Sequence, residues 1–400
     1  MKKFLISFFL LFLLLPLEAF TEDETLQKND IPVIKQDEKK EIIFSFDVEL
    51  IPESSESLIR KIEKNILLFS EKLKNKFSVW LSRSTKYIEK MKEILSEKGL
   101  PEDLVYLPLI ESGFNVNARS PKNAIGPWQF IESTARRYGL IVDWWRDERK
   151  DPIKSTYAAA KYLKDLYGMF GDWSLALAAY NAGEGRIFKA VNKAGENDYW
   201  ILLNTKFLPK ETKEYVPKYI AALTIAKKPE NFGFENIENH NPLSYEEVTI
   251  PSPVDLDIIA ECLQVDLNTV KELNPELKRW STPMNVKEYT IRIPTGKKAE
   301  FLENLNKIPP EKRFSYDVYI TKKGDTVSKI AKKYKLSITV LYEMNGREIF
   351  KNLKPGTEIM LPPHNKFIPL KEDFYIEKKS KRINKKRVSQ RTQIKKSKKV

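Results

Sequence analysis

Apolar side chains recur every three or four residues over most of the chain from residue 58 to residue 226, the spacing of helices that bury one face. Two such stripes come first, and each predicts a helix. They consist of Leu58, Ile62, Ile66, Leu73 and Phe77, and of Trp80, Tyr87, Ile88, Met91, Ile94 and Leu95. Gly99 follows the second stripe, where a glycine commonly ends a helix, and Pro101 is placed to begin the next one.

Further helices are predicted beyond residue 150. Asp151 and Pro152 form a helix start, because an aspartate caps the free N–H groups and proline fits the first turn. An alanine-rich helix follows over 173–181, and helical spacing returns over 211–226. No segment in this part of the chain has the alternation of a strand. The pattern therefore predicts a mainly α domain, to which we assign residues 58–239.

The pattern changes towards the C-terminal end. Residues 319–362 alternate a strand-like run, two short helical stretches and a second strand-like run. The same order occurs at 248–294, and a shift of 71 residues aligns the two segments. The aligned pairs are Ile259 with Ile330, Ala260 with Ala331, Val265 with Leu336, Val270 with Leu341 and Asn274 with Asn345. The chain therefore contains an internal repeat of a small strand–helix–helix–strand unit; a helical hairpin belonging to the first domain is the alternative.

The two ends differ from the rest in composition. Residues 1–20 begin with lysines and continue as an apolar run, typical of a secretory signal peptide; an uncleaved membrane tether is the alternative. Residues 21–57 are polar and acidic, as expected of a linker. Residues 371–400 form a basic tail that we expect to be disordered, and twelve Lys or Arg between 378 and 400 account for all but about +2 of the net charge of +14.

The basic tail bears on the choice of partners. It has no aromatic residues interleaved with its charges for base stacking, so it predicts no specific nucleic-acid partner. After export, anionic wall polymers or a membrane surface are its natural targets, and a solvated extension without a partner is the alternative. We expect the protein to be exported and to be a monomer.

Cysteine and histidine limit the chemistry. Cys262 is the only cysteine, so the chain forms no internal disulfide. The two histidines, His240 and His364, lie far apart in the sequence. We therefore expect no metal site and no cofactor, and neither a zinc amidase nor a Ser-His-Asp hydrolase fits this composition.

Glu111 is the first candidate for chemistry. It follows an uncharged, apolar run, 104–110, that is expected to enter a core, and it opens a polar segment that contains glycine. Burial raises the pKa of a carboxyl group and keeps it protonated near neutrality. A protonated carboxylic acid beside a cleft can give its proton to a leaving oxygen, as glycosidic bond cleavage requires.

Short motifs around and after Glu111 carry a family resemblance. Glu111-Ser112 comes first, Gly126-Pro127-Trp128-Gln129-Phe130 second, and Ala179-Tyr180-Asn181-Ala182-Gly183 third. In this order they resemble the signatures of the soluble lytic transglycosylase family, and Glu211-Thr212 with Tyr215-Val216 is similar to its fourth signature. The resemblance implies a lysozyme-like catalytic domain in which Glu111 is the catalytic acid and base. It also implies a set of substrate-binding residues: Ser112, Gln129, Tyr180, Asn181, Glu211 and Tyr215.

The resemblance implies a role for each of these substrate-binding residues. Ser112 is placed to hydrogen-bond the acid or an N-acetyl group of the substrate, and Gln129 offers an amide to the sugars. Tyr180 and Asn181 match family residues that face the acid, where a phenol can orient the carboxylate. Glu211 and Tyr215 match residues that line the cleft beneath the developing oxocarbenium ion.

The C-terminal repeat resembles a second family. Residues 318–363 are similar to a LysM domain, a βααβ carbohydrate-binding module, in their Gly324-Asp325-Thr326 turn and their Leu361-Pro362 end. The copy at 248–294 has Val254-Asp255-Leu256 in place of that turn, and we interpret it as a degenerate LysM-like module. Whether this copy binds glycan or only packs stays open. The fold class expected is thus a mainly α lysozyme-like domain followed by small α+β modules.

These resemblances imply a peptidoglycan lytic transglycosylase, which cleaves the MurNAc–GlcNAc β-1,4 bond without water and leaves 1,6-anhydro-MurNAc ends. The LysM modules would anchor it to the glycan strands, and the exported protein would then be periplasmic and associated with the cell wall. The alternative within enzymes is a hydrolytic muramidase with a second carboxylate, for which Asp143, Asp147 and Asp151 are the candidates. A non-catalytic peptidoglycan-binding protein is the alternative of another class.

Overall fold

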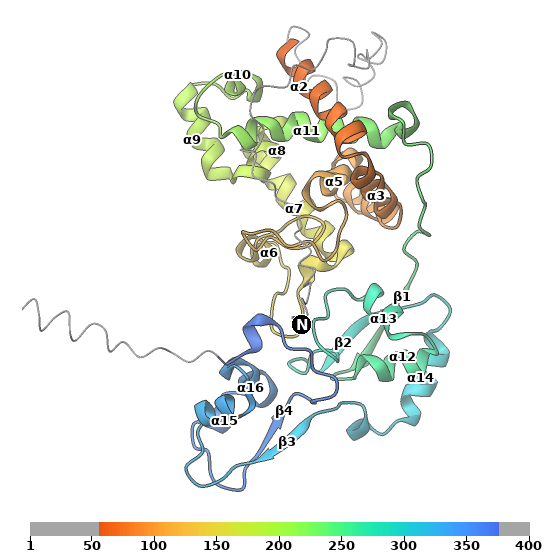
Figure 1. Cartoon of the computed structure of the whole chain (residues 1–400), viewed down its shortest axis with the longest axis vertical. Helices are drawn as coiled ribbons and strands as arrows, with labels where there is room; N and C mark the ends of the chain where they lie inside the picture. The colour runs from red at the N-terminus through yellow and green to blue at the C-terminus, as the bar shows by residue number, and fades with distance from the viewer. Residues whose placement is uncertain (1–55, 376–400) are drawn as a thin grey trace, which may run out of the picture. The chain divides into compact units, whose positions relative to one another are not determined.

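The computed structural model describes residues 56–375 (Figure 1). The predicted signal peptide, residues 21–55 of the predicted linker and the basic tail from residue 376 lie outside the described residues. The chain divides into two compact units. The first comprises the described residues up to Glu247 together with Lys271–Lys278 and Arg292–Gly296, and the second comprises Val248–Val270, Arg279–Ile291 and the described residues from Lys297 onward.

The first unit is built from helices, as its apolar periodicity predicts. They are α2 (Glu56–Leu67), α3 (Lys74–Thr85), α4 (Ile88–Glu97), α5 (Leu107–Ser112), α6 (Glu132–Arg137), α7 (Pro152–Phe170), α8 (Trp173–Ala182), α9 (Glu184–Ala194), α10 (Tyr199–Leu203) and α11 (Lys210–Lys227). Helix α11 packs against α2, α8 and α5, and α7 packs against α4 and α8 (Figure 1). Between residues 58 and 226, all of which are described, β-structure is limited to isolated bridges.

The first apolar stripe differs from its prediction. Leu58, Ile62, Ile66 and Phe77 are buried as expected, but they belong to two helices, α2 and α3. A π-helical turn, Leu68–Lys72, separates them. Apolar spacing records which face is buried and is nearly unchanged by one turn of i→i+5 hydrogen bonding, so the sequence pattern did not reveal the break.

Helix ends agree better with the sequence. Asp151 caps α7, because its Oδ1 accepts the N–H groups of Ile153 at 2.8 Å and Lys154 at 2.9 Å, and Pro152 takes the first helical position. Gly99, with φ of +68°, follows α4 as predicted. Pro101 begins a 3₁₀ turn, Glu102–Tyr106, which leads into the short helix α5.

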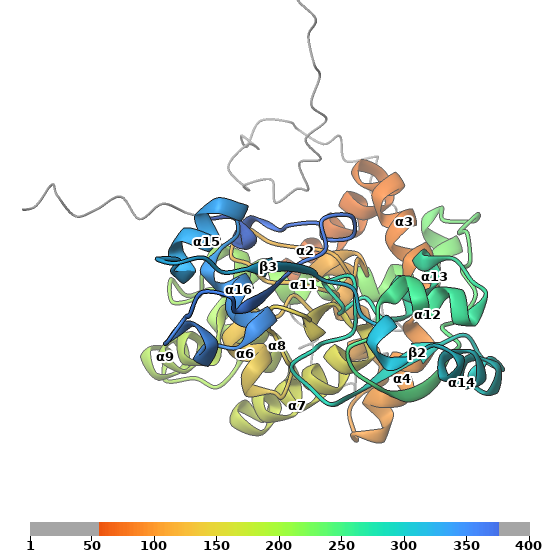
Figure 2. The same ribbon diagram turned by 90° about the horizontal axis from the view of Figure 1, so that it is seen from below.

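Two strand–helix–helix–strand modules follow, as the repeat predicts. The first contains β1 (Glu246–Pro251), α12 (Leu256–Leu263), α13 (Leu267–Leu273) and β2 (Glu288–Ile293), with α14 (Lys298–Lys307) after it. The second contains β3 (Asp317–Ile320), α15 (Val327–Tyr334), α16 (Ile338–Asn345) and β4 (Glu358–Leu361) (Figure 2). Each pair of strands forms a two-stranded sheet, and β3 and β4 are antiparallel with Asp317 opposite Leu361.

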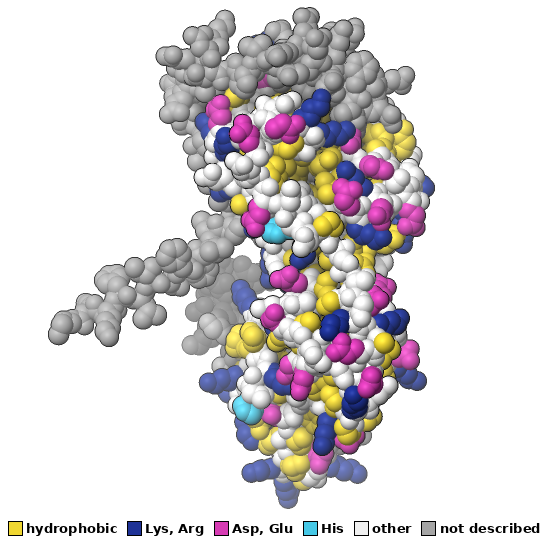
Figure 3. Space-filling model, turned by 90° about the vertical axis from the view of Figure 1, so that its right-hand side faces the viewer, with side chains coloured by type: hydrophobic (Ala, Val, Ile, Leu, Met, Phe, Trp, Pro, Cys, Tyr) yellow, Lys and Arg dark blue, Asp and Glu magenta, His cyan; other side chains and the backbone are white. Residues whose placement is uncertain are grey.

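The surface of the described chain carries charge of both signs. Acidic and basic side chains are interspersed over the face drawn in Figure 3. Within residues 56–375, no helix combines the length and the apolar composition needed to cross a membrane.

Candidate active site

Glu111 lies at the end of α5, a short helix whose first turn is buried. Leu107 and Leu109 are fully buried, and Gly113 ends the helix with φ of +58°. A Cβ on Gly113 would lie 2.2 Å from Cδ1 of Trp80, so only glycine lets the chain turn while the indole packs against it. The apolar run and this turn therefore place Glu111 at the inner edge of the helical domain.

The carboxyl group of Glu111 meets a phenol from a distant part of the chain. Tyr215 Oη donates a hydrogen bond of 2.5 Å to Glu111 Oε1. Burial raises the pKa of Glu111 to about 7, against the opposing effects of the Tyr215 hydrogen bond and the positive charge of Lys218. The negative charge of Glu211 adds to the rise. Glu111 is therefore poised between its protonated and ionised forms near neutral pH.

Helix α11 supplies all three groups that act on Glu111. Glu211, Tyr215 and Lys218 are spaced four and three residues apart, so they share one face of the helix. Burial lowers the pKa of Lys218, and the charges of Glu111 and Glu211 oppose that fall. Lys218 was not predicted from the sequence; its place one turn after Tyr215 was the signal that pointed to it.

Tyr180 and Asn181 lie at the end of α8 and contact the site indirectly. Tyr180 Oη donates to the backbone oxygen of Trp128 at 2.7 Å, and Asn181 Oδ1 accepts from Thr212 Oγ1 at 3.1 Å. The phenol that hydrogen-bonds the carboxyl group of Glu111 is thus Tyr215. The family motif had predicted Tyr180 for this role. Burial raises the pKa of Tyr180 well above its usual value, so its hydroxyl stays protonated.

Ser112 and Gln129 hold the loop between α5 and α6. Ser112 Oγ donates to the backbone oxygen of Pro127 at 2.9 Å, and Gln129 Nε2 donates to that of Gly126 at 2.8 Å. Gln129 has φ of +50°, which is uncommon for a residue other than glycine. These contacts fix the loop backbone beside Tyr180. The hydroxyl of Ser112 donates to backbone carbonyl oxygens and not to Glu111.

The three aspartates considered for a muramidase are engaged elsewhere. Asp143 accepts from the N–H groups of Trp145 and Arg146, and Asp147 forms an ion pair of 2.7 Å with Arg149. Asp151 caps α7. The carboxylate whose charge does act on Glu111 is Glu211, which is exposed.

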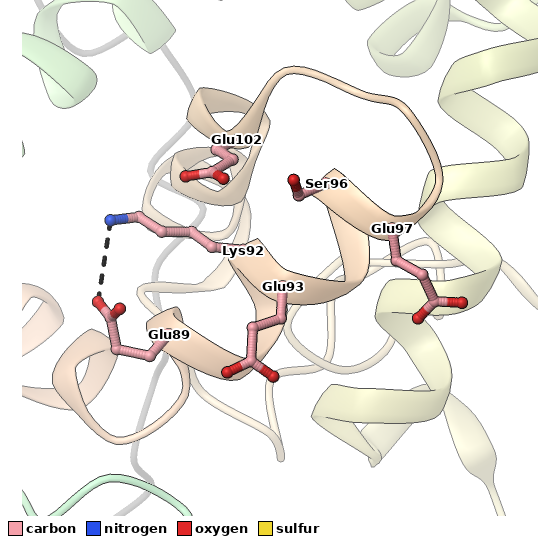
Figure 4. Close-up of a pocket in the computed structure, with 6 residues that line it drawn as sticks. All are labelled: Glu89, Lys92, Glu93, Ser96, Glu97 and Glu102. Atoms are coloured by element: carbon pink, nitrogen blue, oxygen red, sulfur yellow. Dashed lines mark ion pairs between the residues drawn. The ribbon is translucent and has the colours of Figure 1, made fainter.

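Clusters of metal-binding side chains and hollows in the surface are other features that could form a site. Among residues 56–375, no group of three or more His, Cys, Asp or Glu is arranged to hold a metal ion. A hollow of about 520 Å³ lies beside α4 and contains none of the predicted site residues (Figure 4). It is lined by Glu89, Lys92, Glu93, Ser96, Glu97 and Glu102.

Family profiles match three parts of the chain. The Transglycosylase SLT domain matches residues 89–203. The LysM-like domain of the lytic transglycosylase MltD matches residues 244–310, and the LysM domain matches residues 319–362. These matches confirm the fold class predicted from the sequence, a helical lysozyme-like domain followed by LysM modules.

The chain is also similar to individual proteins. The chain is 33% identical over 282 residues to membrane-bound lytic murein transglycosylase D of Escherichia coli. The matched region covers 67% of this chain and 61% of that protein, so the chain spans less than two thirds of this relative's length. It is 35% identical over 152 residues to a putative tributyltin chloride resistance protein of an Alteromonas species, covering 38% of this chain and 72% of that one. The crystal structure of the 70 kDa soluble lytic transglycosylase of Escherichia coli is similar over 36% of this chain and 24% of its own, at 23% identity and a TM-score of 0.31.

Proposed function

Because the chain belongs to the lytic transglycosylase family, with an SLT domain followed by an MltD-type LysM-like domain and a LysM domain, we propose that it cleaves peptidoglycan. The bond cleaved is the β-1,4 bond between MurNAc and GlcNAc, and the product carries a 1,6-anhydro-MurNAc end. The observation that supports this most directly is the partly buried carboxyl group of Glu111, with its pKa raised to about 7 and its hydrogen bond from Tyr215.

The reaction uses one carboxyl group twice. With Tyr215 donating to Oε1, the other oxygen of protonated Glu111 carries the proton and gives it to the bridging oxygen as the C1–O bond breaks. The resulting carboxylate then accepts the proton of the sugar's own C6 hydroxyl, and O6 bonds to C1. The proton that Glu111 loses is thus regained from the substrate, and no water enters the product.

The surroundings of Glu111 suit both steps. Burial favours the acid form before the first step. After it, the hydrogen bond from Tyr215 and the positive charge of Lys218 stabilise the carboxylate. A pKa near the working pH is what a group needs when it acts first as acid and then as base.

The remaining predicted residues would position the substrate. Gln129, Ser112, Tyr180 and Asn181 hold the loop and the helix end beside the acid and offer polar groups to the sugars. Glu211 would lie below the developing positive charge at C1. The LysM module would bind GlcNAc along the strand, and such a protein acts outside the cytoplasm, where peptidoglycan lies.

A hydrolytic muramidase is the second candidate. Its specific support is Glu211, an exposed carboxylate whose charge already acts on Glu111 and which could activate a water molecule. The two candidates differ in product. A transglycosylase releases muropeptides lighter by one water than those of a muramidase.

Mass spectrometry of the products released from purified sacculi tests the proposal. We expect mainly 1,6-anhydro muropeptides, since a C6 hydroxyl already held near C1 outcompetes water. Mainly reducing MurNAc ends, abolished by Glu211→Gln, would establish the muramidase instead.

The variant Glu111→Gln tests the role of the acid itself. The amide is nearly isosteric but cannot supply a proton, so we expect an intact fold and a loss of cleavage of at least ~10²–10⁴-fold. Circular dichroism gives the matched control for folding. Full turnover by a folded variant would remove Glu111 from the mechanism, and an inactive wild-type chain would favour the non-catalytic binding protein.

A further inference from the structure

The closing strand of the LysM-like module carries an arginine that the fold of the module does not require. In the LysM module, Asn345 exchanges two hydrogen bonds with the backbone of Met360, at 2.7 and 2.8 Å. In the LysM-like module, Asn274 makes the same two bonds, both 2.8 Å, with the backbone of Arg292. Arg292 is thus the equivalent of Met360. Because the LysM module has a methionine at this position, the βααβ fold itself does not need an arginine there.

Arg292 belongs to the same compact unit as the helical domain. Its guanidinium forms an ion pair with the buried carboxylate of Asp151. Its Nη1 lies 2.7 Å from Oδ2 of Asp151, and the two side chains are 6% and 0% exposed. The other oxygen of Asp151 caps α7. A buried carboxylate without a cationic partner is strongly unfavourable, so the position of the start of α7 is coupled to Arg292.

Neighbouring residues extend this contact. Lys154, in the first turn of α7, forms ion pairs with Glu148 at 2.8 Å and with Glu276 at 3.4 Å. The backbone oxygen of Glu276 accepts from the N–H of Asp147 at 2.8 Å, and the N–H of Lys278 donates to the backbone oxygen of Trp145 at 2.9 Å. The segment 274–278 therefore runs along the segment 145–148 and holds it on one side.

The other side of that segment supports the loop of the candidate active site. The backbone oxygen of Arg149 would lie 1.8 Å from a Cβ on Gly126, so the two backbones are in direct contact. The guanidinium of Arg149 donates to the backbone oxygen of Phe130 at 3.2 Å. Trp128, between them, is fully buried and donates to Thr156 of α7 at 2.9 Å, while its backbone oxygen accepts from Tyr180.

We propose that Arg292 is a positioning residue for the reaction. Through Asp151 it fixes the segment 143–151, and through that segment the loop 126–130, which carries Gln129 and holds Tyr180. This inference rests on the proposed function for its kinetic consequence, but its structural consequence stands without it. The LysM-like module would thus complete the catalytic domain, a role separate from any binding of glycan.

The test uses the full chain with Arg292→Met, which installs the residue of the equivalent position in the LysM module. We expect kcat on soluble glycan strands to fall by ~10–100-fold, because small displacements of positioning groups are costly, with little change in KM. Arg292→Lys should recover part of the loss. The double variant Arg292→Met with Asp151→Asn should have a higher kcat than Arg292→Met alone, since an asparagine still caps α7 and carries no buried charge that needs Arg292. Lys287→Met removes an exposed charge from the same module and serves as the matched control.

A second measurement does not depend on activity. Hydrogen exchange followed by mass spectrometry should show faster exchange in residues 126–130 of Arg292→Met and unchanged exchange in residues 319–362. If exchange in 126–130 and kcat both stay at the wild-type values well below the melting temperature, the positioning role is wrong. If exchange changes but the wild-type chain yields no anhydro product, the proposed function fails while the coupling stands.

Discussion

The two βααβ modules share a fold and differ in what surrounds them. Both bury the same Ile-Ala pair, Ile259-Ala260 and Ile330-Ala331, and both clamp the closing strand with an asparagine. In the LysM module, Thr326 caps α15, whereas in the LysM-like module Asp255 at the start of α12 makes no such cap. The degenerate copy therefore retains the elements that fold the unit and has lost the turn that resembles the LysM family.

The difference extends to their surfaces. The LysM module lies wholly in the second compact unit, where Lys333 lies 4.1 Å from the ring centre of Tyr319, and Val318 and Tyr334 are exposed. Segments 271–278 and 292–296 of the LysM-like module belong instead to the first unit. The LysM module thus keeps exposed apolar and aromatic side chains, whereas part of the LysM-like module packs with the helical domain in the first unit. A repeated sequence does not imply a repeated function.

Removing each module should separate these roles most strongly. A chain ending at residue 243 leaves Asp151 without Arg292, and losing the partner of a buried charge costs about 3–5 kcal/mol of unfolding free energy. We expect this chain to melt earlier and to cleave soluble glycan strands poorly. Denaturant unfolding and a soluble-strand assay measure both effects.

The matched variant replaces residues 317–363 with a short Gly-Ser linker, so that both residues of the buried ion pair of 2.7 Å, Arg279 and Asp373, stay in the chain. It should cleave soluble strands normally but lose retention on sacculi by ~10²–10⁴-fold, because binding to the polymer raises the effective concentration of the enzyme. Equal retention of this variant and the wild-type chain would refute the anchoring role of the LysM module.

The two asparagine clamps offer a milder form of the same comparison. Asn274→Ala and Asn345→Ala each remove two hydrogen bonds to a closing strand, which should cost ~1–3 kcal/mol of local stability. We expect Asn274→Ala to slow cleavage of soluble strands, and Asn345→Ala to weaken binding to sacculi alone. If both variants affect the same assay, the division of roles between the modules does not hold.

The smallest expected effect concerns the acid itself. Activity requires protonated Glu111, so kcat/KM should fall as the pH rises through its pKa of about 7. The positive charge of Lys218 lowers that pKa, so Lys218→Met should raise it and move the alkaline limb of the profile to higher pH by a fraction of a unit.

Controls on α11 and in the module sharpen this prediction. Lys213→Met removes a charge from another side of α11 and should leave the limb in place. Asn274→Ala should lower the rate without moving the limb, because the module acts on geometry. A limb that stays fixed with Lys218→Met would mean that Lys218 does not set the pKa of Glu111. A limb that moves with Asn274→Ala would mean that the LysM-like module affects that pKa.

Sequence alone determined many of the helices and the central group. Apolar spacing predicted the buried faces of α2 to α4, though not the break between α2 and α3, and it predicted α8 and α11, but not the short helices α6, α9 and α10. Asp151-Pro152 predicted the start of α7, and the uncharged run before Glu111 predicted an acid with a raised pKa. The repeat predicted both βααβ modules, down to the paired asparagines. Each of these follows from neighbours along the chain, because periodicity and caps are local properties.

Tertiary structure decided which groups meet. Tyr215 reaches Glu111 across 104 residues of sequence, and Arg292 reaches Asp151 across 141. Periodicity records that a face is buried but not which element covers it, so the phenol was expected from Tyr180 and Lys218 was overlooked. Electrostatic and hydrogen-bond effects depend on distances of a few ångströms, and those distances are set by the packing of α11 against α5 and by the contact of Arg292 with Asp151 at the start of α7.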